Sequence, residues 1–460
     1  MKAWEHEYNF RKSLKPEDYQ GGETEWGLLD GILESRKQHL FFLWESQVPG
    51  SFAPDSLFYT AVQAWENQGH DVSTAVNLLP LAVEARKNKD WGVLEQLTGR
   101  IFKALYDAPK DPDHIYHKFS LPQNWEEILG AMPCRAGCYQ YDNEAPNEKI
   151  YHGWLGQICG GSYGTALEGY TSRNLLNAFG DKLDAYVTEP ETYNDDITFQ
   201  IALLSAVDKL EKGTEFSSDK IADEWLRLIF FGWSAEYYAL ENLRRGIYPP
   251  ESGSFRNAYS EWIGAQMRTM VCGLLAPGDP VKAAHLAWLD GRVSHTGNGI
   301  YAGIHSAAMT SLAFTIDDPR ELLLESRNCI PSDTLFLYYF DIAIKTVKNS
   351  SDHLEAWGKI EPVIKPYHWI HAIPNMMAVV LSLWFGEKDM TRSFRILGEC
   401  GLDVDCNAGE VGTILGVMNN AVPKSWAGPI GDTLKTYVPG YEKMSIMELA
   451  DWTVKLGRKF

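Results

Sequence analysis

The sequence predicts an all-α fold, and three observations support that class. Between residues 153 and 164, glycines recur at helical spacing, which would let a neighbouring helix or a ligand approach the backbone. Asp279-Pro280 and Asp318-Pro319 each place a good N-cap residue before a proline at the first helical position. Alternating apolar and polar runs bounded by turns, which are typical of strands, are nearly absent.

The composition is that of a large globular chain with an acidic surface. Its 460 residues are 45% apolar and 12% aromatic, which is enough for an extensive core. The 61 acidic and 42 basic residues leave a net charge of -19, and no basic run offsets it. We therefore expect no nucleic-acid partner and no anionic membrane partner.

The sequence carries no pattern typical of membrane insertion or export. No apolar run reaches the roughly 18 residues of a transmembrane helix, and the first residues lack the apolar core of a signal peptide. The seven cysteines are an odd number scattered over the chain, which favours reduced thiols. These patterns lead us to expect a cytoplasmic protein.

The chain divides into two regions near residue 150. Residues 24–106 are expected to form several helices, whereas residues 107–150 contain five prolines and are expected to form loops. We expect residues 1–145 to be an N-terminal helical region of unknown role and residues 150–460 to be a compact helical domain. The alternative is a single domain over which the proline-rich stretch packs as an irregular belt.

Two acidic motifs, far apart in the sequence, are the main candidates for a functional site. Asn194-Asp195-Asp196 precedes an apolar helical stripe, and a structural role as N-cap and first turn explains it when taken alone. In an extended segment Asp403 and Asp405 would point the same way, with Gly401 making a tight turn before them. Together the four carboxylates could hold two hard divalent cations for hydrolytic chemistry.

Two further motifs place polar side chains among glycines. Glu168 follows the glycine-rich helix and is a candidate general base or metal ligand; the alternative is an exposed charge at a helix C-terminus. Ser294, His295, Asn298 and Tyr301 offer hydrogen-bonding groups suited to a phosphate or a ribose. A structural capping role for His295 remains the alternative.

In these motifs the chain resembles the ADP-ribosylglycohydrolase family, from about residue 150 to residue 420. Five motifs occur in the family's order, which is a specific signal for the family and a weaker one for the substrate. The matching segments are the glycine-rich helix leading to Glu168, Asp195-Asp196, Ser294-His295 with Asn298-Gly299, Pro374-Asn375 before a long helix, and Gly401 to Asp405.

The resemblance implies an all-α catalytic domain over residues 150–460 with two Mg²⁺ ions in a central cleft, Mn²⁺ being the alternative ion. It implies hydrolysis at the anomeric carbon of a ribose. The implied catalytic residues are Glu168, as base or gate, and Asp403. The implied metal ligands are Asn194, Asp195, Asp196, Asp403 and Asp405. The implied substrate contacts are Gly161, Ser294, His295, Asn298, Gly299 and Tyr301.

Three positions depart from the family pattern. Gly161 stands where the family usually has Asp, and Asn194 stands where Thr is common. Cys406 replaces a Thr that often contributes a hydroxyl ligand, and a cysteine is a poor partner for magnesium. These changes bear on whether a second metal position is occupied.

Two classes of function remain open from the sequence. The first is a magnesium-dependent hydrolase of a small-molecule ribosyl or ADP-ribosyl substrate, with a protein conjugate as the competing substrate. The second is a non-catalytic relative that binds a nucleotide-like ligand or serves a structural role, like the J1 crystallins of the lens. The four aspartates favour the enzyme, because a purely structural protein has no need to crowd acids. The oligomeric state is left open.

Overall fold

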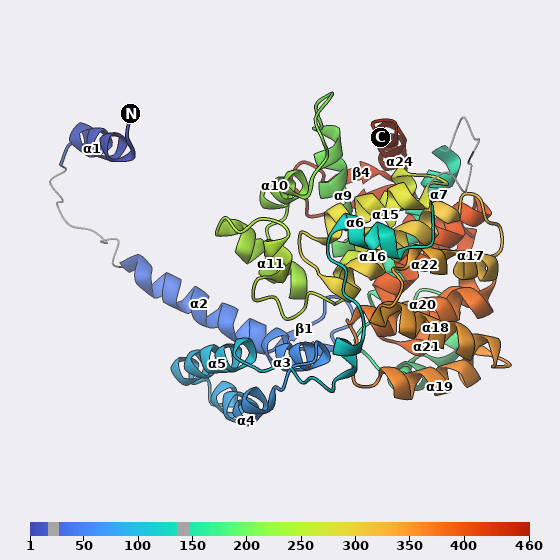
Figure 1. The fold of residues 1–460 in the computed structure, drawn as a ribbon, viewed down its shortest axis with the longest axis horizontal. Helices are drawn as coiled ribbons and strands as arrows, with labels where there is room; N and C mark the ends of the chain where they lie inside the picture. The colour runs from blue at the N-terminus through green and yellow to red at the C-terminus, as the bar shows by residue number, and fades with distance from the viewer. Residues whose placement is uncertain (17–26, 136–140, 142–146) are drawn as a thin grey trace.

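The computed structural model describes residues 1–16, 27–135, 141 and 147–460, and these residues are largely helical (Figure 1). The all-α prediction is confirmed. The described strands form two short antiparallel pairs, β1 (Ser46–Gln47) with β2 (Pro54–Asp55) and β3 (Thr433–Lys435) with β4 (Lys443–Ser445). Within these ranges no helix combines the length and apolar character needed to cross a bilayer.

The elements of the first part are α1 (Ala3–Ser13), α2 (Leu28–Trp44), α3 (Leu57–Asn67), α4 (Ser73–Lys87), α5 (Trp91–Tyr106), η2 (Ile115–Lys118) and α6 (Trp125–Ala131). Of the first part of the chain, α2 to α5 lie beside a larger helical body, as the blue segments of Figure 1 show, whereas α6 packs on that body through Trp125 and Trp288.

The body contains the remaining helices. In its first half these are α7 (Asn147–Gly164), α8 (Ser172–Ala178), η3 (Gly180–Asp184), α9 (Asp195–Asp208), α10 (Ser218–Leu228), α11 (Ser234–Arg244), α12 (Glu251–Ser254), α13 (Gly264–Arg268), α14 (Met270–Leu275), α15 (Pro280–Gly291) and α16 (Gly297–Leu312). In its second half they are α17 (Pro319–Ser326), η4 (Arg327–Cys329), α18 (Leu335–Lys348), α19 (His353–Ile364), α20 (Ala372–Gly386), α21 (Met390–Cys400), α22 (Val404–Asn419), α23 (Lys424–Ile430) and α24 (Ile446–Gly457).

The pairing of α7 with α22 lies at the centre of the body and brings two distant parts of the sequence together. Glycines on both helices let the backbones touch. A Cβ at Gly156 would lie 2.1 Å from the carbonyl oxygen of Gly412, and a Cβ at Gly160 would lie 2.0 Å from that of Ala408. Only glycine permits this approach, so the helical spacing of glycines seen in the sequence is a packing feature.

Hydrogen bonds join the first helices to the body. Gln63 Nε2 of α3 donates to the carbonyl oxygen of Pro366 at 2.8 Å, and Tyr106 Oη of α5 donates to that of Arg256 at 3.0 Å. Hydrophobic side chains of both parts also belong to one continuous buried cluster. The predicted domain boundary between residues 145 and 150 is not tested by these contacts and stays a prediction.

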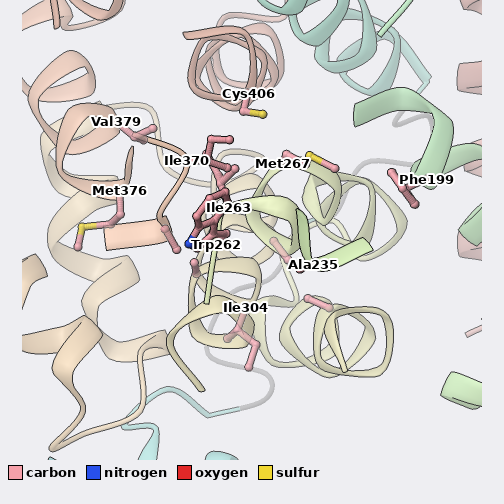
Figure 2. Close-up of a cluster of buried hydrophobic side chains, with 14 of the residues drawn as sticks. Phe199, Ala235, Trp262, Ile263, Met267, Ile304, Ile370, Met376, Val379 and Cys406 are labelled. Carbon is pink, nitrogen blue, oxygen red and sulfur yellow. The ribbon is translucent and has the colours of Figure 1, made fainter. Parts of the chain in front are cut away.

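Part of the buried core supports the site described below. Figure 2 shows Ile263 and Ile370 at its centre, with Cys406 of α22 and Met267 of α13 next to them and Phe199 of α9 farther out. All five side chains are buried, and all five also line one cavity. These core side chains therefore form part of the cavity lining and hold it in place.

Two local expectations differ from the structure. The proline-rich stretch 107–150 holds η2 and α6 and is not only loop. Pro374-Asn375 lies inside α20 and does not precede it. Pro374 is the third residue of that helix, where its missing N–H has no intrahelical acceptor, so the helix loses no hydrogen bond. The N-caps expected at Asp279 and Asp318 are confirmed, since each side chain accepts a backbone N–H of the first turn.

Candidate metal centre

The start of α9 places the first acidic pair. Asn194 is the N-cap, and its Oδ1 accepts the backbone N–H of Asp196 at 2.7 Å. Asp195 and Asp196 form the first turn, where acidic side chains complement the helix dipole. The capping role foreseen from the sequence is thus present, and it orients the carboxylates.

The start of α22 places the second acidic pair, but not as an extended segment. Asp403 is the N-cap of α22 and Asp405 lies in its first helical turn, so the expected strand-like geometry was wrong. The preceding turn is tight, because Gly401 has φ +73 and Leu402 has φ 70. The helix begins directly after this turn and brings both carboxylates toward α9. Asn194 Nδ2 donates to Asp405 Oδ2 at 3.1 Å and links the two helix starts.

The carboxylates form two groups that share Asp405. One oxygen each of Glu168, Asp403 and Asp405 lie within 4.8 Å of one another. Asp405, Asp196 and the thiol of Cys406 make a second group within the same distance. Asp196 Oδ2, Asp403 Oδ1 and Asp405 Oδ1 are buried and have no hydrogen-bond partner. Buried carboxylate oxygens without partners are costly in a protein.

Burial and mutual repulsion raise the pKa of several of these groups. Desolvation is the larger cause and the charge of Asp405 the next for Asp195, whose pKa rises to about 6. The same two causes, in the same order, raise the pKa of Glu168, Asp196 and Asp403 well above their ordinary values. A divalent cation would remove both penalties, because it replaces the lost hydration and offsets the negative charges.

The donor set fits a hard cation such as Mg²⁺. Carboxylate oxygens are the ligands such ions prefer, and Asp196, Asp403 and Asp405 each keep one buried oxygen without a partner. Cys406 is the exception, since its Sγ donates to Asp196 Oδ1 at 3.3 Å. Burial and the nearby carboxylates raise the pKa of the Cys406 thiol, so it stays protonated and is a donor to Asp196.

Glu168 lies in the turn that follows α7. The helix ends at Gly164, so the glutamate is not on the helix itself. Its side chain is mostly buried, with 9% exposed, and it faces Asp403 and Asp405. The alternative from the sequence, an exposed charge at the C-terminus of the helix, is therefore wrong, because Glu168 is buried and lies beyond the end of α7. Gly164 matters here, because a Cβ on it would lie 2.1 Å from the backbone nitrogen of Asp405.

A cavity of about 430 Å³ opens above the carboxylates. Glu168, Asp195, Asp403 and Asp405 are among the residues that line it, together with Asn194. Aromatic side chains from several elements line the rest. They are Phe42, Tyr193, Phe199, Phe230, Phe231, Trp233, Trp369 and Tyr437. A polar ligand group can therefore lie against the carboxylates while an apolar group lies against the rings.

The predicted substrate contacts in the segment 294–301 are buried and do not line this cavity. Ser294 Oγ accepts from Arg268 Nη2 at 2.9 Å and lies 2.7 Å from Nδ1 of His295. Asn298 Nδ2 donates to Glu261 at 2.9 Å, and Tyr301 Oη donates to a backbone carbonyl at 2.7 Å. Gly299 packs against the backbone of residue 260.

Gly161 is close to the site but also outside the main cavity. A Cβ there would lie 3.2 Å from Asn194 Nδ2, so this glycine leaves room for the N-cap side chain. The substrate-binding role assigned to Gly161 and to the segment 294–301 stays a prediction.

The sequence did not point to Glu236, which lies in the first turn of α11 and lines the cavity. Its Oε1 accepts from Arg268 Nη1 at 2.6 Å, and Arg268 also donates to Asp290 at 2.5 Å. Burial raises the pKa of Glu236 to about 7, although the positive charge of Arg268 acts in the opposite direction. The aromatic run Phe230-Phe231-Gly232-Trp233 lies directly before α11 and is the sequence signal that could have pointed to this part of the cavity lining.

Comparison with known proteins places this geometry in a family. A solved structure described as an ADP-ribosylglycohydrolase-related protein complex has a TM-score of 0.48 and 17% sequence identity, covering 69% of this chain and 99% of that one. Curated proteins give no match. The sequence profile of the ADP-ribosylglycohydrolase family matches residues 142–459, a range that covers most of the chain and contains both acidic helix starts. The chain therefore belongs to the ADP-ribosylglycohydrolase family.

Proposed function

We propose that this protein is a magnesium-dependent hydrolase that cleaves the anomeric bond of a small ADP-ribosyl or related N-ribosyl substrate. The observation that carries the proposal is the pair of acidic groups that share Asp405, because Glu168, Asp403 and Asp405 line a cavity and Asp196 lies beside Asp405 behind them. Membership of the family supports glycosyl hydrolase activity. Two adjacent cation positions with a shared carboxylate are a common arrangement for hydrolysis.

The two groups divide the ligands between two cations. Glu168, Asp403 and Asp405 would hold one Mg²⁺ or Mn²⁺ ion, and Asp405 with Asp196 would hold the other. Asp195 lines the same cavity and would complete the ligand set. Bound cations supply positive charge that orients ribose hydroxyls and makes a nearby water more acidic.

The chain's own residues account for the proton transfer. Glu168 would accept a proton as a water oxygen bonds to the anomeric carbon, and the bond from that carbon to nitrogen breaks with its electron pair leaving on nitrogen. One oxygen of Glu168 lies within 4.8 Å of oxygens of Asp403 and Asp405, which would place the base beside a water held at the cations. Asn194 holds Asp405 in place through its hydrogen bond.

The test is release of free reducing ribose or ADP-ribose from a panel, with Mg²⁺, with Mn²⁺ and with EDTA. The panel holds ADP-ribosyl-arginine, an ADP-ribosyl-serine peptide, O-acetyl-ADP-ribose and simple N-ribosides. We expect cation-dependent release from at least one compound, which also identifies the leaving group. No release from any compound, with Mg²⁺ binding confirmed by a thermal shift, would favour a relative that binds without catalysis.

A further inference from the structure

The two acidic groups that meet at Asp405 differ in one donor. The first group, Glu168 with Asp403 and Asp405, offers only carboxylate oxygens. The second combines the carboxylates of Asp196 and Asp405 with the thiol of Cys406. Oxygen suits hard cations such as Mg²⁺, and sulfur suits softer cations such as Zn²⁺. The two positions, here the all-oxygen position and the thiol position, are therefore chemically unequal although they share Asp405.

The distances at the thiol position suit a four-coordinate cation. Cys406 Sγ lies 3.3 Å from Asp196 Oδ1, and one ligand atom each of Cys406, Asp196 and Asp405 lie within 4.8 Å of one another. Zinc binds sulfur at about 2.3 Å and carboxylate oxygen at about 2.1 Å, so tetrahedral ligation separates the sulfur from the oxygen by about 3.6 Å. A cation can therefore bind between Sγ and Oδ1 after only a small shift of either side chain.

Buried oxygens without partners point to a ligand at the thiol position. Asp196 is 1% exposed and Asp405 is 5% exposed, and Oδ2 of the first and Oδ1 of the second have no hydrogen-bond partner. A bound cation would compensate both carboxylates. Asp405 and Cys406 also line the main cavity, so a fourth ligand can reach the cation from there. Three protein ligands and one open position are the pattern of catalytic zinc sites.

We propose that the thiol position is selective for a thiophilic divalent cation such as Zn²⁺, beside a Mg²⁺ ion at the all-oxygen position. This assignment rests on the proposed function, which places cations on both sides of Asp405. The thiol proton leaves to solvent as Sγ becomes a ligand, and Asp196 Oδ1 is then free to bind the same ion. Selectivity is a matter of relative affinity, so Mg²⁺ or Mn²⁺ at high concentration still reaches this position through the two carboxylates.

Co²⁺ binding tests the assignment in the full-length protein, because Co²⁺ bound to a thiolate absorbs strongly in the near ultraviolet and Co²⁺ bound only to oxygen does not. The metal-free protein is titrated with Co²⁺ while Mg²⁺ is saturating. We expect a thiolate absorption band that grows until one equivalent of Co²⁺ has bound. One equivalent of Zn²⁺ should abolish the band by displacing Co²⁺, whereas a large excess of Mg²⁺ should not.

Cys406→Ser removes the sulfur and keeps a small polar side chain. This variant should lose the band, and its affinity for Zn²⁺ should fall by at least about tenfold, since even groups that only orient a metal ligand contribute that much. Its Mg²⁺-dependent rise in Tm should remain, because the all-oxygen position is intact. Cys272→Ser is the matched control and should keep the band, since Cys272 is also a buried free thiol but lies in α14 and belongs to neither acidic group.

X-ray absorption at the zinc edge gives a result that needs no variant. In the native protein loaded with saturating Mg²⁺ and one equivalent of Zn²⁺, we expect a zinc–sulfur distance of about 2.3 Å. Zinc bound only to oxygen or nitrogen would overturn the inference. This measurement decides the case if Cys406→Ser does not fold.

The outcomes separate the inference from the proposed function. Co²⁺ that raises Tm without a thiolate band, or a band that persists in Cys406→Ser, would overturn the inference and leave the proposed hydrolase standing. A band that is lost in Cys406→Ser, in a protein that releases ribose from no compound, would support the inference and contradict the proposed reaction. If no divalent cation changes the spectrum or Tm, the inference and the cation site of the proposed function both fail.

Discussion

Asp405 belongs to both carboxylate groups, and its charge contributes to the raised pKa of Asp195, Asp196, Asp403 and Glu168. In the absence of a cation these side chains repel one another, and all of them except the exposed Asp195 are buried. A site of this kind lowers the stability of the metal-free protein and raises its affinity for cations.

The variant Asp405→Asn separates those two effects. In EDTA it should raise the free energy of unfolding by on the order of 1–3 kcal/mol, because it removes the shared repulsive charge. In Mg²⁺ the stabilisation seen for the native protein should be lost. Thermal unfolding with and without Mg²⁺ measures both.

Asp290→Asn is the matched control, because that carboxylate is equally buried but is paired with Arg268 at 2.5 Å. This control should lower stability by about 3 kcal/mol in either condition. Two results would contradict the cation assignment. One is a lower stability of Asp405→Asn than of the native protein in EDTA, and the other is an Mg²⁺-dependent rise in Tm that persists in this variant.

Glu168→Gln tests the proton acceptor. Turnover of the best substrate should fall by about 10²–10⁴-fold, since an amide cannot accept the proton of the attacking water. The Mg²⁺-dependent thermal shift should survive, because all four aspartates of the site are unchanged. Glu410→Gln serves as the control: Glu410 is buried in α22, accepts from Gln266 at 2.7 Å and does not line the cavity. Near-normal turnover by Glu168→Gln would remove its catalytic role.

At the residue scale the sequence identified the acidic residues through their types and order, and it could not show their partners. Asp195, Asp196, Asp403, Asp405 and Glu168 do converge. The polar segment 294–301 looked equally suited to a ligand, yet its side chains bond to protein groups such as Arg268 and Glu261. A hydrogen-bonding side chain in a glycine-rich turn has the same signature whether its partner is a ligand or a buried charge.

At the scale of elements, the contact of α7 with α22 holds Glu168 and Asp405 at one place. The glycines at their interface exclude side chains from the space between the two backbones. The start of α22 is therefore set by how closely α7 approaches it. A substitution that separates α7 from α22 should therefore move the backbone at the start of α22 and, with it, the carboxylates of Asp403 and Asp405.

Gly160→Ala tests that dependence. The added methyl group would lie 2.0 Å from the carbonyl oxygen of Ala408, so the helices must separate. We expect a loss of about 3 kcal/mol or more in the free energy of unfolding, measured by chemical denaturation, together with weaker Mg²⁺ binding.

Gly358→Ala provides the comparison, because Gly358 lies inside α19 with nothing within 4 Å of the new methyl group. That change should stabilise the protein by about 0.5–1 kcal/mol. Equal effects of the two substitutions would mean that the α7–α22 contact is not as close as described.

Helix starts were the features best predicted from the sequence. The caps at Asn194, Asp279 and Asp318 depend only on a side chain and a backbone N–H two or three residues later. The geometry after Gly401 was not predictable in the same way. A short segment before a helix can be extended or already helical, and here the tight turn at Gly401 and Leu402 lets α22 begin at Val404. Asp403 and Asp405 still converge, but as cap and first turn.

At the scale of the whole molecule, protonation couples stability to pH. The folded-state pKa of Asp195 is about 6, against an ordinary value of 3.8, so between those values the folded protein binds more protons than the unfolded chain. Stability of the metal-free protein therefore decreases as pH rises through this window. This loss of stability is complete above about pH 6, where Asp195 is ionised in both states, and absent below about pH 4, where it is protonated in both.

Asp195→Asn removes this titration. Relative to the native protein in EDTA, the variant should gain stability as pH rises from 4 to 6.5, and the difference should then stay constant. The gain should be below about 1 kcal/mol, because Asp195 is exposed and solvent screens its charge. Denaturant unfolding across this range measures it. A difference between the two proteins that does not change with pH would show that Asp195 titrates normally.

The aromatic lining of the cavity comes from segments that are far apart in the sequence, so no single stretch of sequence predicts it. Phe42 comes from α2, Trp233 from the segment before α11, Trp369 from the loop before α20 and Tyr437 from the region between β3 and β4. Trp233 belongs to the aromatic run before α11, but nothing in the sequence shows that these four segments meet. The packing of α2 against the body brings Phe42 to the cavity, and packing within the body brings Trp233, Trp369 and Tyr437 there. Composition and spacing therefore predicted the fold and the acidic cluster but not the aromatic lining of the cavity.

Anomalous diffraction from crystals soaked in Mn²⁺ would test the central claim most directly. The account predicts two peaks flanking Asp405, one beside Glu168 and Asp403 and the other beside Asp196. Both should vanish in Asp405→Asn crystals grown and soaked in the same way. No peak at these carboxylates in the native protein, or peaks that survive the substitution unchanged, would contradict it.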